Sequence, residues 1–521
     1  MRKYFSRSIG RMTVGVVLLC APAPIVFSAC TNLTEVPKDA LTPTNAFHTD
    51  PEVLAGVASV YAQLRSTMDD RYNLSEITTD EIIVPTRGQD WYDNGRWLEI
   101  YKHNWNANSG SALTDMNGAW NNLFSGVARA NLMIDVITQA GGPTSAQTLA
   151  ELRTLRAWYY YMLMDFFGGV PLVTSTKVEA SPRVTRDSLF RFIESELKET
   201  STILPATRPA DQAGRLTSGA ANAILASLYL NAQVYTGTVT AGGLTKGTAR
   251  WADAIAAADK VINSGQYTLE ADWTHNFAPD NHDSKENIFY IANTDASPGL
   301  GMNFPHRTLH YNQLNTQGGP WNGFATIAET YNAFDPADKR RNIFLVGQQY
   351  SFDTKLPVKD RGGNPLVFSI TIGDETKAAE NEGPRYNKFP PKPGTPDASS
   401  EPNNFPFFRL AEMYLIKAEA MNELGQTAGA IAQVNIIRAR QFTPPNPLAA
   451  GLSQAAARDA IFNERLFELT GEGKRRSDMI RAGTYVSARR FKTPSSPYKI
   501  LFPIPQTQLA SNPQLVQNPG Y

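Results

Sequence analysis

The 521-residue sequence is poor in cysteine and has no excess of charge of either sign. Its two cysteines, Cys20 and Cys30, are too few for the disulfide framework that holds many small secreted domains together. Lys and Arg total 49, and Asp and Glu also total 49. The chain therefore lacks the basic excess with which proteins neutralise nucleic-acid phosphates, and we expect no nucleic-acid partner.

Catalytic motifs are equally scarce. There is no Gly-x-Ser-x-Gly elbow, and the Gly-Lys pair at 473–474 is followed by Arg475 where a phosphate-binding loop needs Ser or Thr. His306 and His310 have the spacing of helical zinc ligands, but Arg307 replaces the Glu of a zinc protease. We expect no metal, no cofactor and no catalytic residue. Paired carboxylates for glycoside hydrolysis leave no local mark, so a surface glycosidase stays open as an alternative.

Long apolar runs are absent except near the N-terminus. Four basic residues within the first eleven precede a mostly apolar stretch over 12–29, which is the pattern of a secretory signal peptide. Pro22 and Pro24 interrupt this stretch, so it would make a poor membrane-spanning helix.

The end of this stretch resembles a bacterial lipobox. Phe27-Ser28-Ala29-Cys30 places a cysteine where that motif needs the residue that is lipidated after cleavage, although Phe27 stands where Leu is usual. We predict a lipoprotein signal peptide at 1–29 and a lipidated, polar tether at 30–43, anchored in a membrane through Cys30. A plain signal peptide with Cys30 as a bystander is the alternative.

What the chain does contain is repeated amphipathic helices, often with glycine at the turns. Paired helices of this kind indicate a tetratricopeptide-like array, so the predicted fold is mainly α, an α-α superhelix. Its helical repeats are expected at 44–266 and 406–483. The helices are predicted at 51–68, 113–140, 151–167, 187–204, 218–234, 252–263, 407–424, 427–440 and 452–470.

Between 267 and 405 helical periodicity fades, and Gly, Pro, Asn and aromatic residues dominate. A short helical stretch at 326–334 and a strand at 287–291 are the expected exceptions. Loops of this length are usually functional or partly disordered. We predict a loop-rich, irregular insertion packed on the helical array, and a single domain over 44–521.

Six motifs in order along the chain resemble the SusD/RagB family. One departure is Ser477, where an aromatic residue is common in the family. The motifs are LRAWYYYMLMDFFGGVPLV (155–173), RLTSGAANAILASLYLNA (215–232), YNAFDPADKRR (331–341), RLAEMYLIKAEAMNELG with NIIRAR (409–425 and 435–440), NERLFELTGEGKRRSDMIRAG (463–483) and PIPQTQLASNPQLVQNPGY (503–521).

The resemblance implies a nutrient-binding lipoprotein of the outer membrane, facing outside, that is not an enzyme. Its partner would be a TonB-dependent, SusC-like outer-membrane transporter, over which it acts as a lid. The ligand would be an oligosaccharide, or alternatively a peptide. A repeat scaffold that binds only protein is a further alternative.

The charged residues of these motifs lie on predicted helices with opposite charges three or four positions apart. This spacing favours a structural network of ion pairs over catalysis. The residues are Arg409, Glu412, Glu419, Arg438, Glu464, Arg465, Glu468, Glu472, Arg475, Asp478 and Arg481.

Two loop segments, 88–97 and 310–324, combine aromatic rings with amide and charged groups. Aromatic faces stack on the apolar faces of sugars, and the polar groups fix a ligand's orientation by hydrogen bonds. Some rings, Trp97 above all, could instead anchor the loop to the helices. The predicted ligand-binding residues are Trp91, Tyr92, Asp93, Asn94, Arg96, Tyr311, Trp321 and Asn322.

Overall fold

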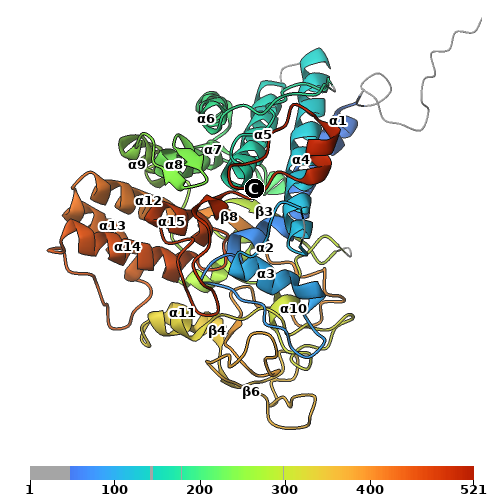
Figure 1. The fold of residues 1–521 in the computed structure, drawn as a ribbon. Helices are drawn as coiled ribbons and strands as arrows, with labels where there is room; N and C mark the ends of the chain where they lie inside the picture. Colours follow the sequence, from blue (N-terminus) through green and yellow to red (C-terminus); the bar gives the residue numbers. More distant parts are fainter. Residues whose placement is uncertain (1–46, 48, 109, 141–144, 178, 297–298) are drawn as a thin grey trace, which may run out of the picture. The chain divides into compact units, whose positions relative to one another are not determined.

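A computed structural model describes residues 47–521 apart from 48, 109, 141–144, 178 and 297–298 (Figure 1). The predicted signal peptide, Cys30 and the tether lie outside the described residues. Residues 47–521 form one compact unit.

Helices dominate the first half of this unit, and local sequence signals set their ends. Thr49 and Glu52 form a capping box at the start of the first helix, and the Thr217 side chain accepts from Ala220 N at the start of another. Gly168, at φ +72°, ends a helix at 167, where the helix predicted at 151–167 also ends. The helices are α1 (Asp50–Ser66), α2 (Asp70–Glu76), α3 (Arg96–Lys102), α4 (Leu113–Ala140), α5 (Ser145–Phe167), α6 (Arg186–Ile203), α7 (Ser218–Leu230), α8 (Ala232–Tyr235) and α9 (Trp251–Ile262).

A second group of helices follows the insertion. They are α12 (Leu410–Glu423), α13 (Thr427–Arg438), α14 (Gln454–Leu469), α15 (Arg475–Ala482) and α16 (Gln506–Ser511). Each helix of the array packs on its neighbour in the order α1, α4, α5, α6, α7, α9, α12, with α13 and α14 both on α12. The α9–α12 contact joins the two groups into one continuous array (Figure 1). The predicted mainly α superhelix is confirmed.

The insertion between α9 and α12 has short strands and loops, as expected, and lies below the helices in Figure 1. All strand pairs are antiparallel: β1 with β2, β3 with β8, β4 with β7 and β5 with β6. The elements are β3 (Asn287–Ile291), α10 (Phe304–Thr308), α11 (Ala328–Ala333), β4 (Phe344–Leu345), β5 (Gly347–Gln348), β6 (Val367–Phe368), β7 (Arg385–Tyr386) and β8 (Phe405–Arg409), with β1 (Thr238–Thr240) and β2 (Gly243–Thr245) before α9.

Three predicted helix boundaries are off by more than two residues, and one of them is the start of α5, which begins at Ser145 and not at 151. The helix predicted at 407–424 starts only at Leu410, because residues 405–409 form β8 and pair with β3. Every residue of β8 is buried, and a fully buried apolar run has no periodicity that separates strand from helix. The helix predicted at 218–234 breaks at Asn231, whose side chain donates to Ser227 O at 2.9 Å.

A continuous apolar core lies between the array and the insertion. Trp158 of α5 is 1% exposed and packs against Phe289 of β3 and Phe407 of β8, with ring centroids 5.8 and 4.6 Å away. The strand pair that closes the insertion is therefore fixed onto the array by aromatic contacts. None of the described helices has the length and apolar character needed to cross a membrane.

Candidate ligand-binding site

The charged family motifs form a cluster of ion pairs under the surface. Arg409 is fully buried, and its guanidinium donates to Glu286 at 2.8 Å, Glu468 at 2.7 Å and Glu472 at 2.8 Å. Arg340 bonds the other oxygen of Glu468 at 2.9 Å. We call these five residues the buried ion-pair cluster. It continues through Lys388, Arg438, Arg440 and Glu464.

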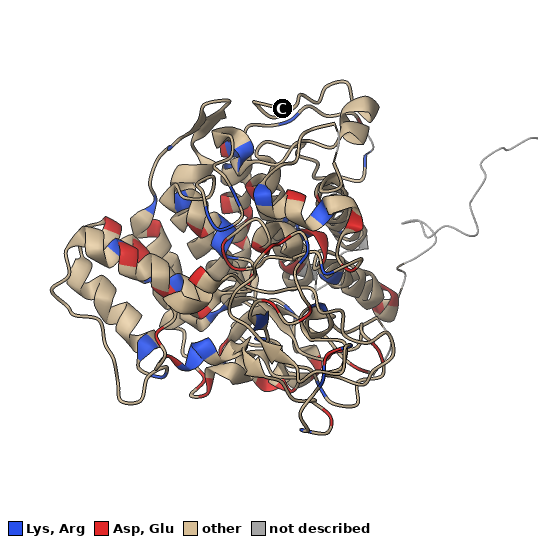
Figure 2. Ribbon diagram, turned by 60° about the horizontal axis from the view of Figure 1, so that its bottom comes forward, with Lys and Arg blue, Asp and Glu red and all other residues tan. Residues whose placement is uncertain are grey.

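Electrostatics inside this cluster are fully compensated. Burial would raise the pKa of Glu468, but Arg409, Arg440 and Arg340 hold it well below its usual range. A carboxylate held in this way cannot act as a proton donor near neutral pH. In Figure 2 the acidic and basic residues are interspersed along the same elements. These motif residues form the network of ion pairs that their spacing predicted.

The same holds for the charged residues around α15. Arg465 Nε donates to Asp478 at 2.8 Å, and Arg481 donates to Glu419 at 2.7 Å. Arg475 forms a two-point pair with Asp80, both bonds being 2.8 Å long. These pairs join α15 to α12, α14 and the segment after α2.

The two aromatic segments, far apart in the sequence, meet in space. Trp91 Nε1 donates to Trp321 O at 2.6 Å, and the two indole rings lie 6.4 Å apart between centroids, inclined by 52°. Both rings are half-buried, so each keeps part of its surface open to solvent. Beside them Tyr92 is 55% exposed.

The position of Trp91 depends on an unusual local backbone. Trp91 has φ +61°, and the following turn is left-handed at Asn94 (φ +55°) and Gly95 (φ +82°), residue types that tolerate this conformation. The indole lies against Gly323, where an added Cβ would be 2.2 Å from Trp91 Cε2. Below it, Trp97 is buried, with its ring centroid 5.1 Å from that of Trp91. Trp97 is therefore the loop anchor that the sequence suggested.

A polar edge borders the aromatic rings. Tyr311 donates to Asp90 Oδ2 at 2.5 Å, and the Arg361 guanidinium lies over the Tyr311 ring at 4.1 Å. Arg361 also donates to Asp90 at 3.2 Å and to Glu380 at 2.5 Å, while its side chain remains 49% exposed. Trp91, Tyr92, Trp321, Tyr311, Asp90 and Arg361 are hereafter the aromatic platform.

Hydrogen bonds set the charge state of this edge. Burial acts to raise the pKa of Glu380, but hydrogen bonds from His310 and Arg361 hold this pKa below its usual value. Burial and the hydrogen bond to Asp90 raise the pKa of Tyr311 above its usual value, so its hydroxyl stays a donor. The edge therefore offers one partly exposed cation and carboxylate acceptors within reach of the rings.

The remaining predicted residues shape the loops from which the platform is built. Asp93 accepts from Trp97 Nε1 at 2.6 Å, and Arg96 makes a two-point pair with buried Asp115, both bonds 2.7 Å. Asn94 is exposed at the turn.

Asn322 lies beneath the surface. It is fully buried, donates to Glu380 O at 3.0 Å and accepts from Arg385 at 2.9 and 3.0 Å. Its side chain is thereby fully engaged with the protein. Arg361 was missed by sequence reasoning because it stands in a polar Asp-Arg-Gly-Gly turn without an aromatic residue.

The two histidines with the spacing of zinc ligands, His306 and His310, face different partners. His306 lies on α10, so the expectation of a loop at this position is wrong; Pro305 occupies the first turn of the helix, where proline is tolerated. His306 Nδ1 is 3.9 Å from Glu401 Oε1, whereas His310 Nε2 is 2.9 Å from Glu380. Among the described residues no group of three or more His, Cys, Asp or Glu is placed to hold a metal ion.

Comparison with known proteins shows which family this sequence resembles. Residues 262–491 and 482–521 match the model of the SusD family, and residues 41–230 match one described as starch-binding, associating with outer membrane. SusD-like protein P25 of Formosa agariphila is 24% identical, covering 95% of this chain and 97% of its own length. The starch-binding protein SusD of Bacteroides thetaiotaomicron is also 24% identical, covering 86% of this chain and 85% of its own.

Solved structures have the same fold. Surface glycan-binding protein A from Bacteroides fluxus superposes with a TM-score of 0.72 at 23% identity, covering 91% of this chain and 100% of its own. Surface glycan-binding protein A from Bacteroides thetaiotaomicron, in complex with laminarihexaose, gives a TM-score of 0.71 at 22% identity, with the same coverage of 91% and 100%.

Proposed function

This chain belongs to the SusD family, and we propose that it binds a glycan at the outer-membrane surface through the aromatic platform. The observation that carries the proposal is the meeting of Trp91 and Trp321, half-buried rings from two distant loops, beside a charged edge. A surface of this kind matches the two faces of a sugar, its apolar C–H face and its rim of hydroxyls.

Each part of the platform has a distinct task in this proposal. Trp91 and Trp321 stack on successive sugar rings, and their 52° inclination suits a curved chain better than a flat one. Tyr92, with more than half of its side chain exposed, extends the apolar surface. Arg361 donates to hydroxyl oxygens, and the Asp90 carboxylate accepts from hydroxyl groups. The printed names of relatives that bind starch or laminarihexaose support a glycan as the ligand.

Delivery is part of the same proposal. We propose that Cys30 carries the lipid anchor, that the protein faces outside, and that a TonB-dependent, SusC-like transporter takes up the bound glycan. The family membership supports this partner. Deleting the transporter gene should abolish uptake of the glycan while leaving surface binding by this protein intact; uptake that continues unchanged would contradict the partnership.

The direct test is isothermal titration of residues 31–521, which include the whole compact unit, against soluble glycans and peptides. We expect binding of at least one glycan without release of new reducing ends. Trp321→Ala should lose that binding, while Trp251→Ala, a half-buried tryptophan on α9, should keep it. Binding of peptides but of no glycan would show that the ligand is a peptide. Glycan turnover would show that the protein is an enzyme.

A second matched pair uses exposed tyrosines. Tyr92 and Tyr350 are 55% and 51% exposed, but only Tyr92 belongs to the platform. Tyr92→Ala should weaken glycan binding, and Tyr350→Ala should leave it unchanged. Equal losses would show that the ligand does not distinguish the platform from other exposed aromatic residues.

A further inference from the structure

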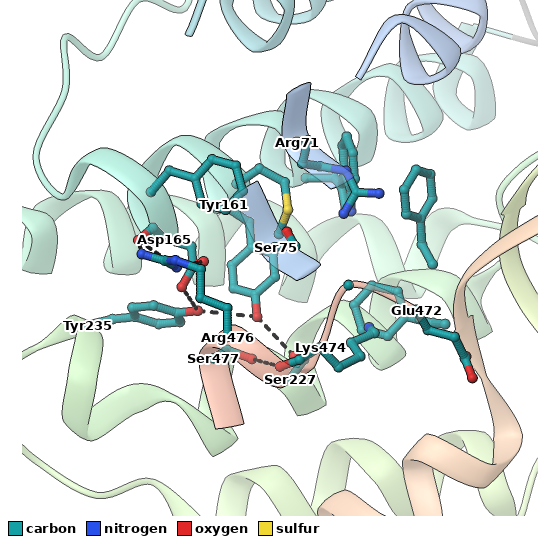
Figure 3. Close-up of a pocket in the computed structure, with 16 residues that line it drawn as sticks. Arg71, Ser75, Tyr161, Asp165, Ser227, Tyr235, Glu472, Lys474, Arg476 and Ser477 are labelled. Atoms are coloured by element: carbon teal, nitrogen blue, oxygen red, sulfur yellow. Dashed lines mark hydrogen bonds and ion pairs between the residues drawn. The ribbon is translucent and has the colours of Figure 1, made fainter. Parts of the chain in front are cut away.

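A small cavity lies in the interior, away from the aromatic platform. It has a volume of about 40 Å³ and is lined mainly by α2, α5, β8 and the segment that leads into α15 (Figure 3). Arg71 and Ser75 of α2 line it, together with Tyr161 of α5 and Lys474. About 10–15 Å³ is enough for one water molecule, so the cavity has room for a small ion and its hydration.

Arg71 is the unusual member of this wall. Its side chain is 2% exposed, yet no carboxylate forms an ion pair with it in the described part of the chain. One Nη2 hydrogen bond, to Met68 Sδ at 3.4 Å, is weak, and Nε is buried without a partner. Aromatic faces surround the guanidinium, with Phe407 at 4.9 Å and Trp158 at 6.0 Å. Ring faces attract a cation but do not neutralise its charge.

The other charged groups of the wall already have partners. Lys474 pairs with Glu412 at 2.8 Å, and Arg476 pairs with Asp165 at 2.5 Å. Glu472 is held by Arg409 at 2.8 Å and also by Lys388. Figure 3 shows Asp165 turned toward Arg476, and Glu472 pointing away from Lys474. Neither wall carboxylate is therefore left to neutralise Arg71.

A neighbouring carboxylate is also engaged elsewhere. Glu76, five residues along from Arg71, accepts from the Gly473 amide at 2.5 Å. Burial is the largest influence on Glu76 and raises its pKa, while its hydrogen bonds and the charges of Lys388 and Arg71 act in the opposite direction. Its carboxylate forms no ion pair with Arg71. A buried and unpaired cation of this kind is costly unless something else neutralises it.

From this arrangement we propose that the cavity binds a small monovalent anion of about the size of chloride, held by the Arg71 guanidinium and the Ser75 hydroxyl. Ser75 lies one helical turn after Arg71, so both side chains are on the same face of α2. Gly473 keeps the space open, because an added Cβ there would lie 3.1 Å from Arg71 Nη1. The anion links α2 to the segment that begins α15, independently of glycan binding.

The first test is crystallographic. Crystals of residues 31–521 are soaked in sodium bromide, and anomalous diffraction is measured at the bromine absorption edge. We expect a bromide peak inside the cavity, within contact distance of Arg71. Water density in the cavity without an anomalous peak, or bromide at surface sites only, would overturn the proposal.

The second test measures thermal stability in solution. At constant ionic strength, replacing the large anion gluconate by chloride should raise the melting temperature of the wild type by about 1–2 °C, since a ligand that binds only the folded state stabilises it. Arg71→Met should show no such rise. Arg458→Met, which removes an exposed cation, should keep it.

A second variant tests the proposal if Arg71→Met does not fold. Ser75→Ala removes only a hydroxyl and should reduce both the bromide peak and the chloride-dependent rise. An equal rise in the wild type, Ser75→Ala and Arg458→Met would overturn the proposal, since the chloride effect would then be general. A bromide peak without a chloride-dependent rise in melting temperature would mean binding at crystal concentration only. That result would also overturn the proposal.

Discussion

The buried ion-pair cluster and the aromatic platform both combine side chains from distant segments of the chain. They differ in how many of their hydrogen-bonding groups already have a partner within the protein. In the cluster, Glu468 accepts from three arginines and nothing faces solvent. In the platform, Arg361 and Tyr92 keep about half of their surfaces exposed. A saturated, buried set of charges fixes one structure, whereas an exposed and partly unsaturated set leaves hydrogen-bonding capacity for a ligand.

The strongest charge motif joins two parts of the fold, and for that reason we do not propose it as the ligand site. Arg340, Arg409 and Glu468 come from the insertion, β8 and α14, so the cluster joins the insertion to the helical array. Desolvating these charges costs free energy that only complete pairing offsets. Removing one partner should therefore harm folding far more than any change in the platform.

The largest expected effect follows from breaking the cluster. Arg409→Met leaves three buried carboxylates without their shared cation, and we expect a loss of about 3–5 kcal/mol in the free energy of unfolding. Arg458→Met removes an exposed arginine paired with Glu423 and should cost at most about 1 kcal/mol. Urea denaturation followed by circular dichroism measures both. Similar losses for the two variants would show that the buried cluster contributes no more to stability than an exposed ion pair.

The next effect concerns the platform itself. Trp321→Ala should weaken glycan binding by about 10- to 100-fold, in line with the loss of one stacked aromatic ring. Its free energy of unfolding should change much less than that of Arg409→Met, because the ring is only half-buried. Titration calorimetry and thermal melting together separate the two effects. A variant that loses stability and affinity in parallel would place Trp321 with the structural residues.

A smaller effect should come from the residues beneath the platform. Burial raises the pKa of Glu401 from 4.5 to about 7 and lowers that of neighbouring His306 from 6.5 to about 4. Glu401 thus holds a proton in the folded state that the unfolded chain releases, so its stabilising contribution is lost as pH rises from about 5 through 7. His306 acts in the opposite direction, because its unfolded form binds the extra proton, and the two contributions nearly cancel.

Glu401→Gln removes the contribution of this glutamate to the pH dependence of stability. Relative to the wild type, the variant should gain about 1–2 kcal/mol in unfolding free energy as pH rises from 5 to 7. Chemical denaturation at several pH values measures the difference. A constant difference between variant and wild type over this range would show that Glu401 does not titrate there.

The smallest effect is expected at the edge of the platform. Arg361→Ala should weaken glycan binding only a few-fold, since an exposed side chain contributes little to a hydrogen bond in water. Stability should be unchanged, because the ion pairs of Arg361 are solvent-exposed. Arg191→Ala, which removes an exposed arginine on α6, is the control that should leave binding intact. A loss as large as that of Trp321→Ala would make charge, and not stacking, the main source of affinity.

Much of the fold could be predicted from the sequence because local signals govern helices. Thr217 caps α7, which begins at the predicted residue 218, and Gly168 ends α5 at the predicted residue 167. The errors occurred where tertiary contacts override local preference. Residues 405–409 became a strand through pairing with β3, and 304–308 became a short helix within the insertion.

The candidate site was predictable only in part. Aromatic composition singled out Trp91, Tyr92 and Trp321, but it also included Asn322, which is buried against Arg385. Nothing local marked Arg361, which reaches the platform only because a turn of the insertion folds back onto Tyr311.

The sequence by itself determined the mainly α array and the order of its helices, since periodicity and capping act over a few residues. Only the tertiary structure decided which polar residues have their hydrogen-bonding groups fully paired within the protein. Burial and the pairing of distant charges depend on contacts such as Arg409 with Glu286, more than a hundred residues apart in the chain. The same contacts set the exposed faces of Trp91 and Trp321 side by side, because a shared surface arises only when separate loops meet.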